Sequence, residues 1–427
     1  MRPAVYTFFV VSFLFAVADY PAYCQSGVDV NAPVTLQEYL QYAALNNAEL
    51  KAAFEQWQAA KEQIPQAGVL PDPKFTYELE ARRSPHGETF GVSQALPWFG
   101  TTQVRTAAAQ ASERAAEKRY QAQRLKLFAE VKQAYYDYIY LARQVEITGQ
   151  NLELLKHFEE VARVRYATSQ TTHPDHIRAQ IETAGAEYEV QILRRLREPL
   201  VARLNAILNR PPSAELPWPR REEFKKIELN HQEIIALAVR HNPDLQAMDF
   251  EVDAARRQVD LAKKKFYPEI EVGVSAMQRS EAIMGPGENP LFATVSLTLP
   301  IWRDSYIAAQ RQADTEVRKS LQQKTAIQNN ITAGVESALY DFESSAGKIE
   351  LYNSVLIPRA KELLTASEAA YINGSIDFLA LIDARRMLLE YQLDCERAVA
   401  ENGRKLAELE MLCGTQLPTA VEKSAAK

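Results

Sequence analysis

The residues best suited to chemistry in this sequence are two histidines and an aspartate that lie close together. His173 and His176 flank Asp175. Imidazole nitrogens and carboxylate oxygens bind transition metals, but they form a strong site only when a rigid frame brings enough of them together. Two histidines and one aspartate at the tip of a turn are a weak ligand set. We therefore predict no metal site and interpret the three residues as surface groups.

Other arrangements typical of catalysis or cofactor binding are not apparent. The sequence shows no glycine-rich phosphate loop, no Ser/His/Asp set and no Cys/His cluster. Cys395 and Cys413 fall in one predicted helix, about 27 Å apart along its axis. A disulfide needs Cα atoms within roughly 7 Å, so these two are interpreted as small buried hydrophobic residues. We predict no enzyme activity and no cofactor.

Composition points to a large helical protein. The chain has 427 residues, of which 47% are hydrophobic and 24% are charged, and its net charge is -6. A nucleic-acid groove needs a basic surface, so this charge argues against a nucleic-acid partner. The 15 glycines are few for this length and favour long helices.

The N-terminus has the pattern of an export signal. Arg2 is followed by an apolar run over residues 6–18, which is too short to span a bilayer comfortably. We predict a signal peptide over residues 1–24, with cleavage after about residues 18–24. Acylation of Cys24 is an alternative, but bulky Tyr23 occupies a position where small residues are required.

The sequence contains an internal duplication. The segment LNNAEL at 45–50 corresponds to RHNPDL at 240–245, and each segment ends one helical pattern and opens another. A Leu-Pro-aromatic or Leu-Pro-Ile-Trp step also occurs twice, at Pro97 and Pro300. We predict a first structural repeat over 36–212, a linker over 213–230, a second repeat over 231–416 and a disordered tail over 417–427.

Each repeat carries two short runs in which apolar and polar residues alternate. The runs cover 74–82, 89–96, 270–276 and 291–299. Period two places the apolar residues on one face of a strand, and about nine residues can cross a bilayer when tilted. Four strands of a soluble sheet packed on helices are an alternative. If the strands span a membrane, several chains must share one barrel, because the smallest barrels have about eight strands and open edges are not tolerated in lipid.

Two helical patterns are too long for a globular protein. They run from Thr101 to Tyr166 and from Asp304 to Tyr371, about 100 Å each if helical throughout. Apolar residues repeat at alternating steps of three and four, which predicts coiled-coil packing, although an ordinary antiparallel bundle has the same pattern. Pro358 is expected to bend or break the second long helix. Shorter helices are predicted over 36–67, 176–209, 231–266 and 377–412.

Together these features resemble the TolC-like outer-membrane efflux family of bacteria. The matching residues are LPWFG at 96–100, LPIWR at 299–303, PDPKF at 71–75 and the YING turn at 371–374. The resemblance implies a mainly α fold with a small β part, in which three chains build a twelve-stranded barrel and a helical periplasmic tunnel. PDPKF and LPWFG also suggest the heavy-metal, CzcC-like branch.

The function implied by this resemblance is passive export. A homotrimer in outer-membrane lipid would be the exit duct of a tripartite efflux system for heavy-metal cations or drugs. A periplasmic adaptor of the membrane fusion type and an inner-membrane pump of the RND type would be its partners. Alternatives are an adaptor or coiled-coil scaffold without a pore, the outer-membrane component of type I protein secretion, and a soluble exported enzyme.

The resemblance also assigns residues to the periplasmic end. Aspartates just past the second turn ring the closed entrance in this family; Asp383 matches one such position, and Asp175 is the repeat equivalent of the other, where this chain has Ala380. The alternative for both aspartates is a solvated helix start favoured by the helix dipole, which we prefer for Asp175. Docking of the adaptor is expected at the two turns, represented by Tyr166, Ser169, Tyr371 and Gly374.

Overall fold

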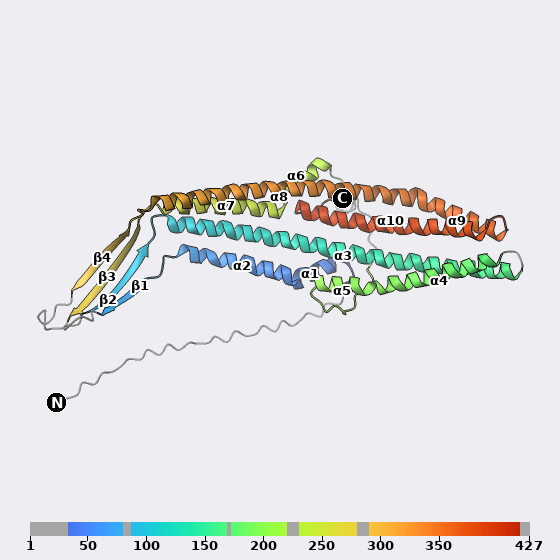
Figure 1. The fold of residues 1–427 in the computed structure, drawn as a ribbon, viewed down its shortest axis with the longest axis horizontal. Helices are drawn as coiled ribbons and strands as arrows, with labels where there is room; N and C mark the ends of the chain where they lie inside the picture. The colour runs from blue at the N-terminus through green and yellow to red at the C-terminus, as the bar shows by residue number, and fades with distance from the viewer. Residues whose placement is uncertain (1–32, 80–86, 169–171, 220–229, 280–289, 419–427) are drawn as a thin grey trace, which may run out of the picture. The chain divides into compact units, whose positions relative to one another are not determined.

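The computed structural model describes residues 33–79, 87–168, 172–219, 230–279 and 290–418. The predicted signal peptide, Ser169 and most of the predicted tail lie outside these residues, as does the second half of the predicted linker. In Figure 1 the strands gather at one end of the body that begins at Pro33, and two helical hairpins form the opposite end. No helix in the described ranges combines the length and the apolar character that crossing a bilayer requires.

The sheet joins the two halves of the chain. Its antiparallel order is β1-β2-β3-β4, so the central pair β2–β3 brings one strand from each half together. Register places Phe75, Val92, Val274 and Ala293 in one row on the same face. The predicted alternation is therefore confirmed. The strands are β1 (Lys74–Leu79), β2 (Gly87–Leu96), β3 (Glu269–Arg279) and β4 (Leu291–Thr298).

The helices follow the predicted order in both halves. In the first half they are α1 (Leu36–Asn46), α2 (Ala48–Gly68), α3 (Thr101–Ala167), α4 (His173–Arg195) and α5 (Arg197–Ile207). In the second half they are α6 (His231–His241), α7 (Pro243–Lys264), α8 (Arg303–Leu351), η1 (Tyr352–Leu356), α9 (Ile357–Ile372) and α10 (Phe378–Cys413). The 67 residues of α3 make a rod about 100 Å long.

Two asparagines divide the shorter helices at equivalent positions. Asn47 separates α1 from α2, and Asn242 separates α6 from α7. Each side-chain oxygen accepts a hydrogen bond from the backbone N–H three residues later, at 2.9 and 3.1 Å. Each side-chain amide donates to a carbonyl near the end of another helix, Ile207 and Leu412 respectively, both at 2.9 Å. The same side chain thus caps one helix and fixes the end of its neighbour.

Of the two outcomes expected at Pro358, a bend or a break, the break does not occur. Residues Tyr352–Leu356 form a π-helical turn just before the proline, and α9 continues from Ile357. Proline lacks the N–H that an α-helix would use at that point, and the wider π turn accommodates the loss without ending the helix.

Beyond the sheet, the helices pack side by side in two successive groups along the long axis, which we call tiers. In the tier next to the sheet, contacts run in the order α2–α3–α7–α8. In the tier at the hairpin end the order is α4–α3–α10–α9. Each tier buries its own apolar residues, among them Phe158 and Phe378 at the hairpin end and Val335 and Leu409 near the middle. The sheet and both tiers are therefore single layers of four elements, each with two margins.

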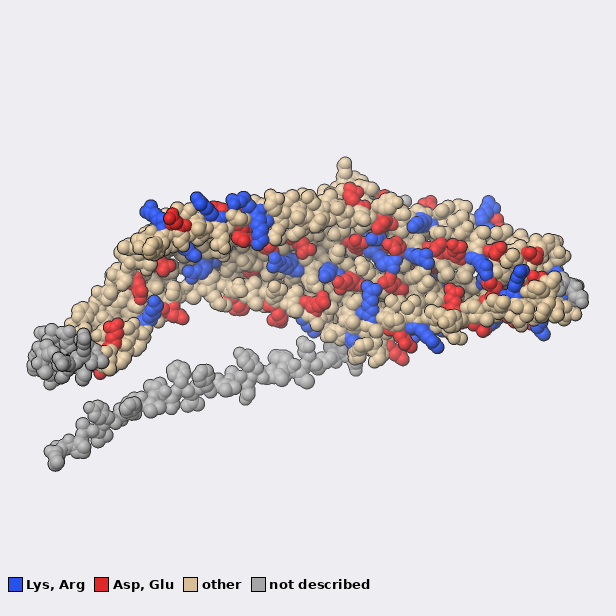
Figure 2. Space-filling view, viewed as in Figure 1, with Lys and Arg blue, Asp and Glu red and all other residues tan. Residues whose placement is uncertain are grey.

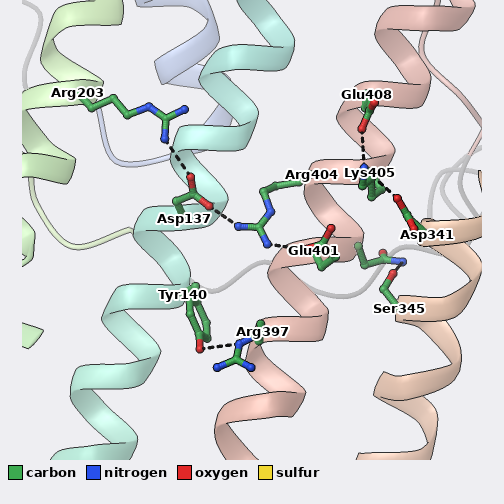
Figure 3. A network of polar contacts seen from close by, with 11 residues as sticks. Asp137, Tyr140, Arg203, Asp341, Ser345, Arg397, Glu401, Arg404, Lys405 and Glu408 are labelled. Atoms are coloured by element: carbon green, nitrogen blue, oxygen red, sulfur yellow. Dashed lines mark hydrogen bonds and ion pairs between the residues drawn. The ribbon is translucent and has the colours of Figure 1, made fainter. Parts of the chain in front are cut away.

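A polar seam joins α3 to α10 near the middle of the molecule. Asp137 of α3 lies between Arg404 of α10 and Arg203 of α5, with 3.3 Å to the Arg203 guanidinium (Figure 3). Arg397 donates to the Tyr140 hydroxyl at 3.3 Å, and Arg143 is paired with Glu396 at 3.1 Å. The hydrogen bonds to Asp137 and Glu401 outweigh burial and raise the pKa of Arg404. These pairs fix the register of the two antiparallel helices.

Close packing between Tyr136 and Gly403 also fixes how α3 and α10 contact each other. The Tyr136 ring lies against Gly403, and a Cβ built on Gly403 would be 2.5 Å from two ring atoms of Tyr136. Both residues are buried, so the ring has little room to move. Only a glycine allows this close approach of α3 and α10.

We expect Gly403→Ala to lower the free energy of unfolding by about 2 kcal/mol, because the added methyl group overpacks the helix contact. Urea unfolding followed by far-ultraviolet circular dichroism measures the change. Gly347→Ala is the matched control, since nothing lies within 4 Å of the Cβ it adds. It should be neutral or stabilising by up to about 1 kcal/mol. Equal stability of the two variants would contradict the assigned fit.

Candidate functional site

The polar face of the sheet is hollowed. A cavity of about 300 Å³ lies on this face, with Thr76, Glu78, Ser93 and Glu271 among its lining residues. The Ser93 hydroxyl donates to the Glu271 carboxylate at 2.6 Å. Along the middle of β3, the polar-face residues Glu271, Gly273 and Ser275 are only partly exposed, while Val272 and Val274 on the other face are exposed. The sheet therefore curves with its polar face inward and its apolar face outward.

The two predicted strand-to-helix steps turn the chain in different ways. Pro97 follows β2, and the turn closes with a Thr101 N–H bond to the Trp98 carbonyl at 3.0 Å and with Gly100 at φ 75°. Pro300 follows β4, where Ile301 and Arg303 each bond to the carbonyl two residues back, at 3.0 and 2.9 Å. In both cases proline removes the donor that would continue the strand ladder.

The first hairpin tip, between α3 and α4, is built around an aromatic stack. Tyr166 is 44% exposed and lies parallel to the His176 ring, with 5.9 Å between centroids. The His173 ring packs on the same tyrosine at 5.2 Å. Both imidazoles thus pack on an aromatic ring, and no group of three or more candidate metal ligands occurs among the residues described.

The second hairpin tip, between α9 and α10, is tighter. Gly374 has φ 75°, and the Ser375 N–H bonds back to the Ala370 carbonyl at 2.8 Å, as in a glycine-capped helix end. Tyr371 is 2% exposed and packs on the Phe378 ring at 5.6 Å. Tyr166 is accessible for docking, whereas Tyr371 supports the turn from within.

Arg165 ties the first tip to the second, and sequence reasoning missed it. Its guanidinium donates to the carbonyls of Tyr371 and Ile372, the latter at 2.7 Å, and lies 4.8 Å from the centre of the Tyr371 ring. Nothing in the local sequence distinguishes this arginine from the other charges on α3, because its partners are backbone atoms 206 and 207 residues away.

The predicted gate aspartates have different surroundings. Asp175 lies in the first turn of α4, accepts a hydrogen bond from the Thr172 hydroxyl at 2.9 Å and lies 3.8 Å from Arg178. Asp383 is exposed on α10 and makes no ion pair or hydrogen bond to the part of the chain that the structure describes. The structure thus ties Asp175 into its own helix start and leaves the Asp383 carboxylate directed to solvent.

A buried arginine clamps the two hairpins together. Arg385 of α10 is 5% exposed and donates to the Asn151 side-chain oxygen of α3 at 2.9 Å and to Glu182 of α4 at 3.3 Å. Burial lowers the pKa of its guanidinium from the ordinary value. Arg386 pairs with the same glutamate. The sequence carried a signal here, because Arg385 occupies a position three after Ile382 and four after Leu381 on an otherwise apolar stripe.

Beside this clamp, a small groove opens between the hairpins. Its volume is about 160 Å³. Its lining combines apolar residues from both hairpins with charged residues. The lining residues are Arg178, Ile181, Glu182, Phe378, Leu379, Ile382 and Arg386.

The two cysteines in the described part of the chain pack as structural residues. Cys395 and Cys413 are both buried, as predicted. The Cys413 thiol donates to the Ile234 carbonyl, and burial raises its pKa to about 11, which keeps the thiol protonated and unreactive.

We expect Glu182→Gln to destabilise the hairpin end by about 2 kcal/mol, because it leaves the buried Arg385 charge without a carboxylate. Hydrogen exchange of α10 amides near the tip should accelerate accordingly. Glu187→Gln is the control on the same helix: Glu187 pairs with Lys156 at 3.6 Å where both side chains are about half exposed, so its loss should cost about 0.5 kcal/mol or less. Unchanged exchange in Glu182→Gln would contradict the clamp.

Comparison with known proteins places this geometry in a family. The model of the outer membrane efflux protein family matches twice, over residues 39–210 and 234–415. The cobalt-zinc-cadmium resistance protein CzcC of Cupriavidus metallidurans is 22% identical over 379 residues, covering 84% of this chain and 85% of CzcC. Both matches favour a channel over an adaptor or a scaffold.

Solved structures show the same fold. The outer membrane protein VceC of Vibrio cholerae superposes with a TM-score of 0.75 at 17% identity, covering 90% of this chain and 97% of VceC. The CmeC outer membrane channel of Campylobacter jejuni gives 0.77 at 13% identity, covering 94% of this chain and 93% of CmeC. With its duplicated family match, outward apolar strands and long helical hairpins, the chain belongs to the outer membrane efflux protein family.

Proposed function

We propose that three copies of this chain close into one exit duct, with a twelve-stranded barrel in the outer membrane and a helical tunnel in the periplasm. The observation that carries this proposal is that the sheet and both helical tiers have open margins. In the sheet, β1 and β4 each have one edge without a partner strand in the described chain. Lipid cannot satisfy the N–H and C=O groups of such an edge, so neighbouring copies must pair with them.

The helical margins support the same closure. At one margin of the hairpin tier, α4 exposes Ile181 (64%), Tyr188 (66%) and Ile192 (46%) at helical spacing. At the opposite margin, Leu351 (48%) and Leu363 (44%) are exposed. Large apolar stripes on opposite margins of one layer suit contact between successive copies around a ring.

The duct would act passively. An exit path needs a water-filled lumen rather than a catalytic centre, and the inward polar face of the sheet provides a lining of that kind. We infer that energy comes from an inner-membrane pump, of the RND type, linked through a periplasmic adaptor. On the face shown in Figure 2, acidic and basic side chains are mixed along the helices, without the single-sign field that a nucleic-acid partner would require.

Heavy-metal cations are the cargo that we propose. The relative CzcC is named for resistance to cobalt, zinc and cadmium. By register, the inward face of the sheet carries Glu78, Glu269 and Glu271 against Lys74 and Arg279, a balance that favours cations over anions.

The hairpin end would form the gate and the docking surface. Asp383, exposed and without a partner among the described residues, is the residue we propose for the gate, where three copies near one axis would repel each other and attract cations. Asp175 would contribute less, because Thr172 and Arg178 hold it locally. We propose that the adaptor docks at the turns containing Tyr166, Ser169 and Gly374 and in the groove beside Leu379.

Assembly is tested by purification from outer membranes in mild detergent. We expect a particle of three times the protomer mass by light scattering, and a trimer band on gels that disappears on heating. Periplasmic recovery of a stable monomer would contradict the proposed duct.

Gating is tested with Asp383→Asn in planar lipid bilayers. Removing three like charges from the entrance should relax the closed state and increase mean conductance several-fold. The charge-matched control is Asp253→Asn, an exposed residue of α7 far from the tips, which should conduct like the wild type. Equal conductance of Asp383→Asn and the control would reject the gate role.

A further inference from the structure

The four junctions between strands and helices lie at one level of the molecule (Figure 1). Each strand end at this level leads into a helix within about six residues. The outward apolar face of the sheet stops here, so this level marks one edge of the hydrocarbon layer in the outer membrane.

Large side chains remain exposed just beyond that edge. Phe99 is 77% exposed, Ile301 67%, Trp302 73% and Tyr267 48%. Amphipathic and aromatic side chains in this position lie among lipid headgroups in membrane proteins. We name the junction collar by its residues Phe99, Lys265, Tyr267, Ile301, Trp302 and Arg303.

The collar is held rigidly by contacts between the halves of the chain. Trp98 stacks on Tyr267 with 5.0 Å between centroids and 11° between ring planes. Lys264 donates to the Phe99 carbonyl at 3.0 Å. Phe266 packs on Tyr306 at 5.8 Å. These contacts hold the Tyr267 ring and the Phe99 backbone in place within the collar.

Two cations of the collar have no partner in the described ranges. The side chains of Lys265 and Arg303 belong to exposed residues and make no ion pair or hydrogen bond there. Lys265 caps the end of α7 and Arg303 begins α8, so both lie at the sheet end of two helices that contact each other. By contrast, neighbouring Lys263 is already paired with Asp260 at 3.4 Å.

Acidic groups nearby do not neutralise this pair. Glu269 belongs to the inward face of the sheet by its register. Asp304 lies in the first turn of α8, where the helix dipole favours a carboxylate. The exposed cations thus remain available next to exposed aromatic rings.

We propose that the junction collar binds anionic glycerophospholipid of the periplasmic leaflet, with Lys265 and Arg303 holding the headgroup phosphate and Trp302 and Phe99 lying at the glycerol level. Because the collar adjoins the apolar face of the sheet, we expect its ligand to be a membrane lipid. Because its two cations have no side-chain partner among the described residues, we expect that lipid to be anionic. This inference rests on the membrane position of the strands and is independent of cargo, pump and adaptor.

The first experiment counts retained lipid. The full-length trimer is placed in nanodiscs containing equal phosphatidylglycerol and phosphatidylcholine, and bound lipid is identified by native mass spectrometry. We expect enrichment of phosphatidylglycerol on the order of fivefold for each free cation. Lys265→Gln with Arg303→Gln should abolish the enrichment. Lys263→Gln, which removes one positive charge outside the collar, should retain it.

A second measurement does not depend on the variants. Phosphatidylglycerol brominated near the glycerol should quench Trp302 fluorescence more than brominated phosphatidylcholine does, with Trp302→Phe identifying the signal. Equal retention of the two lipids by the wild type, or equal quenching by both, would overturn the proposal. A trimer that conducts normally while showing no lipid preference would reject the collar and leave the duct intact.

Discussion

The backbone of the sheet margins is the constraint on which the molecule depends. A strand edge in hydrocarbon cannot exchange its hydrogen bonds for water, so β1 and β4 must meet other copies. The chain meets this demand along its whole length, since each helical tier is also one element thick with two margins. Neighbouring copies can therefore meet margin to margin along the whole molecule, from the sheet to the hairpin tips.

Within one copy, the layer is organised by a few fixed points rather than by a single core. Asn47 and Asn242 set where the shorter helices divide. The Tyr136–Gly403 fit and the Asp137 pairs set how α3 and α10 slide against each other, and Arg385 sets the spacing of the two hairpins. All of these contacts cross between segments distant in sequence, so they convert a duplicated string of helices into one wall.

Patterns of local period were predictable from the sequence. The alternation of apolar and polar residues predicted which face of each strand is apolar and, nearly, where all four strands begin and end. The apolar residues at alternating steps of three and four predicted the long helices. Contacts with no local signature were not predictable: Arg165 binds carbonyls of a distant turn, and Gly403 resembles any helical glycine until Tyr136 is placed against it. The π turn before Pro358 escaped for a related reason, since proline can be accommodated by widening a helix as well as by breaking it.

Because of that π turn, the second long helix, formed by α8, η1 and α9, is less regular than its counterpart α3. The ladder of α3 is uninterrupted for 67 residues, whereas the corresponding limb changes its hydrogen-bond register at Tyr352–Leu356. Long helices kink at π turns, where the regular hydrogen-bond pattern is interrupted. The two halves of the duplicated fold therefore differ: α3 is continuous, whereas the second long helix carries a π turn, the kind of irregularity at which helices kink.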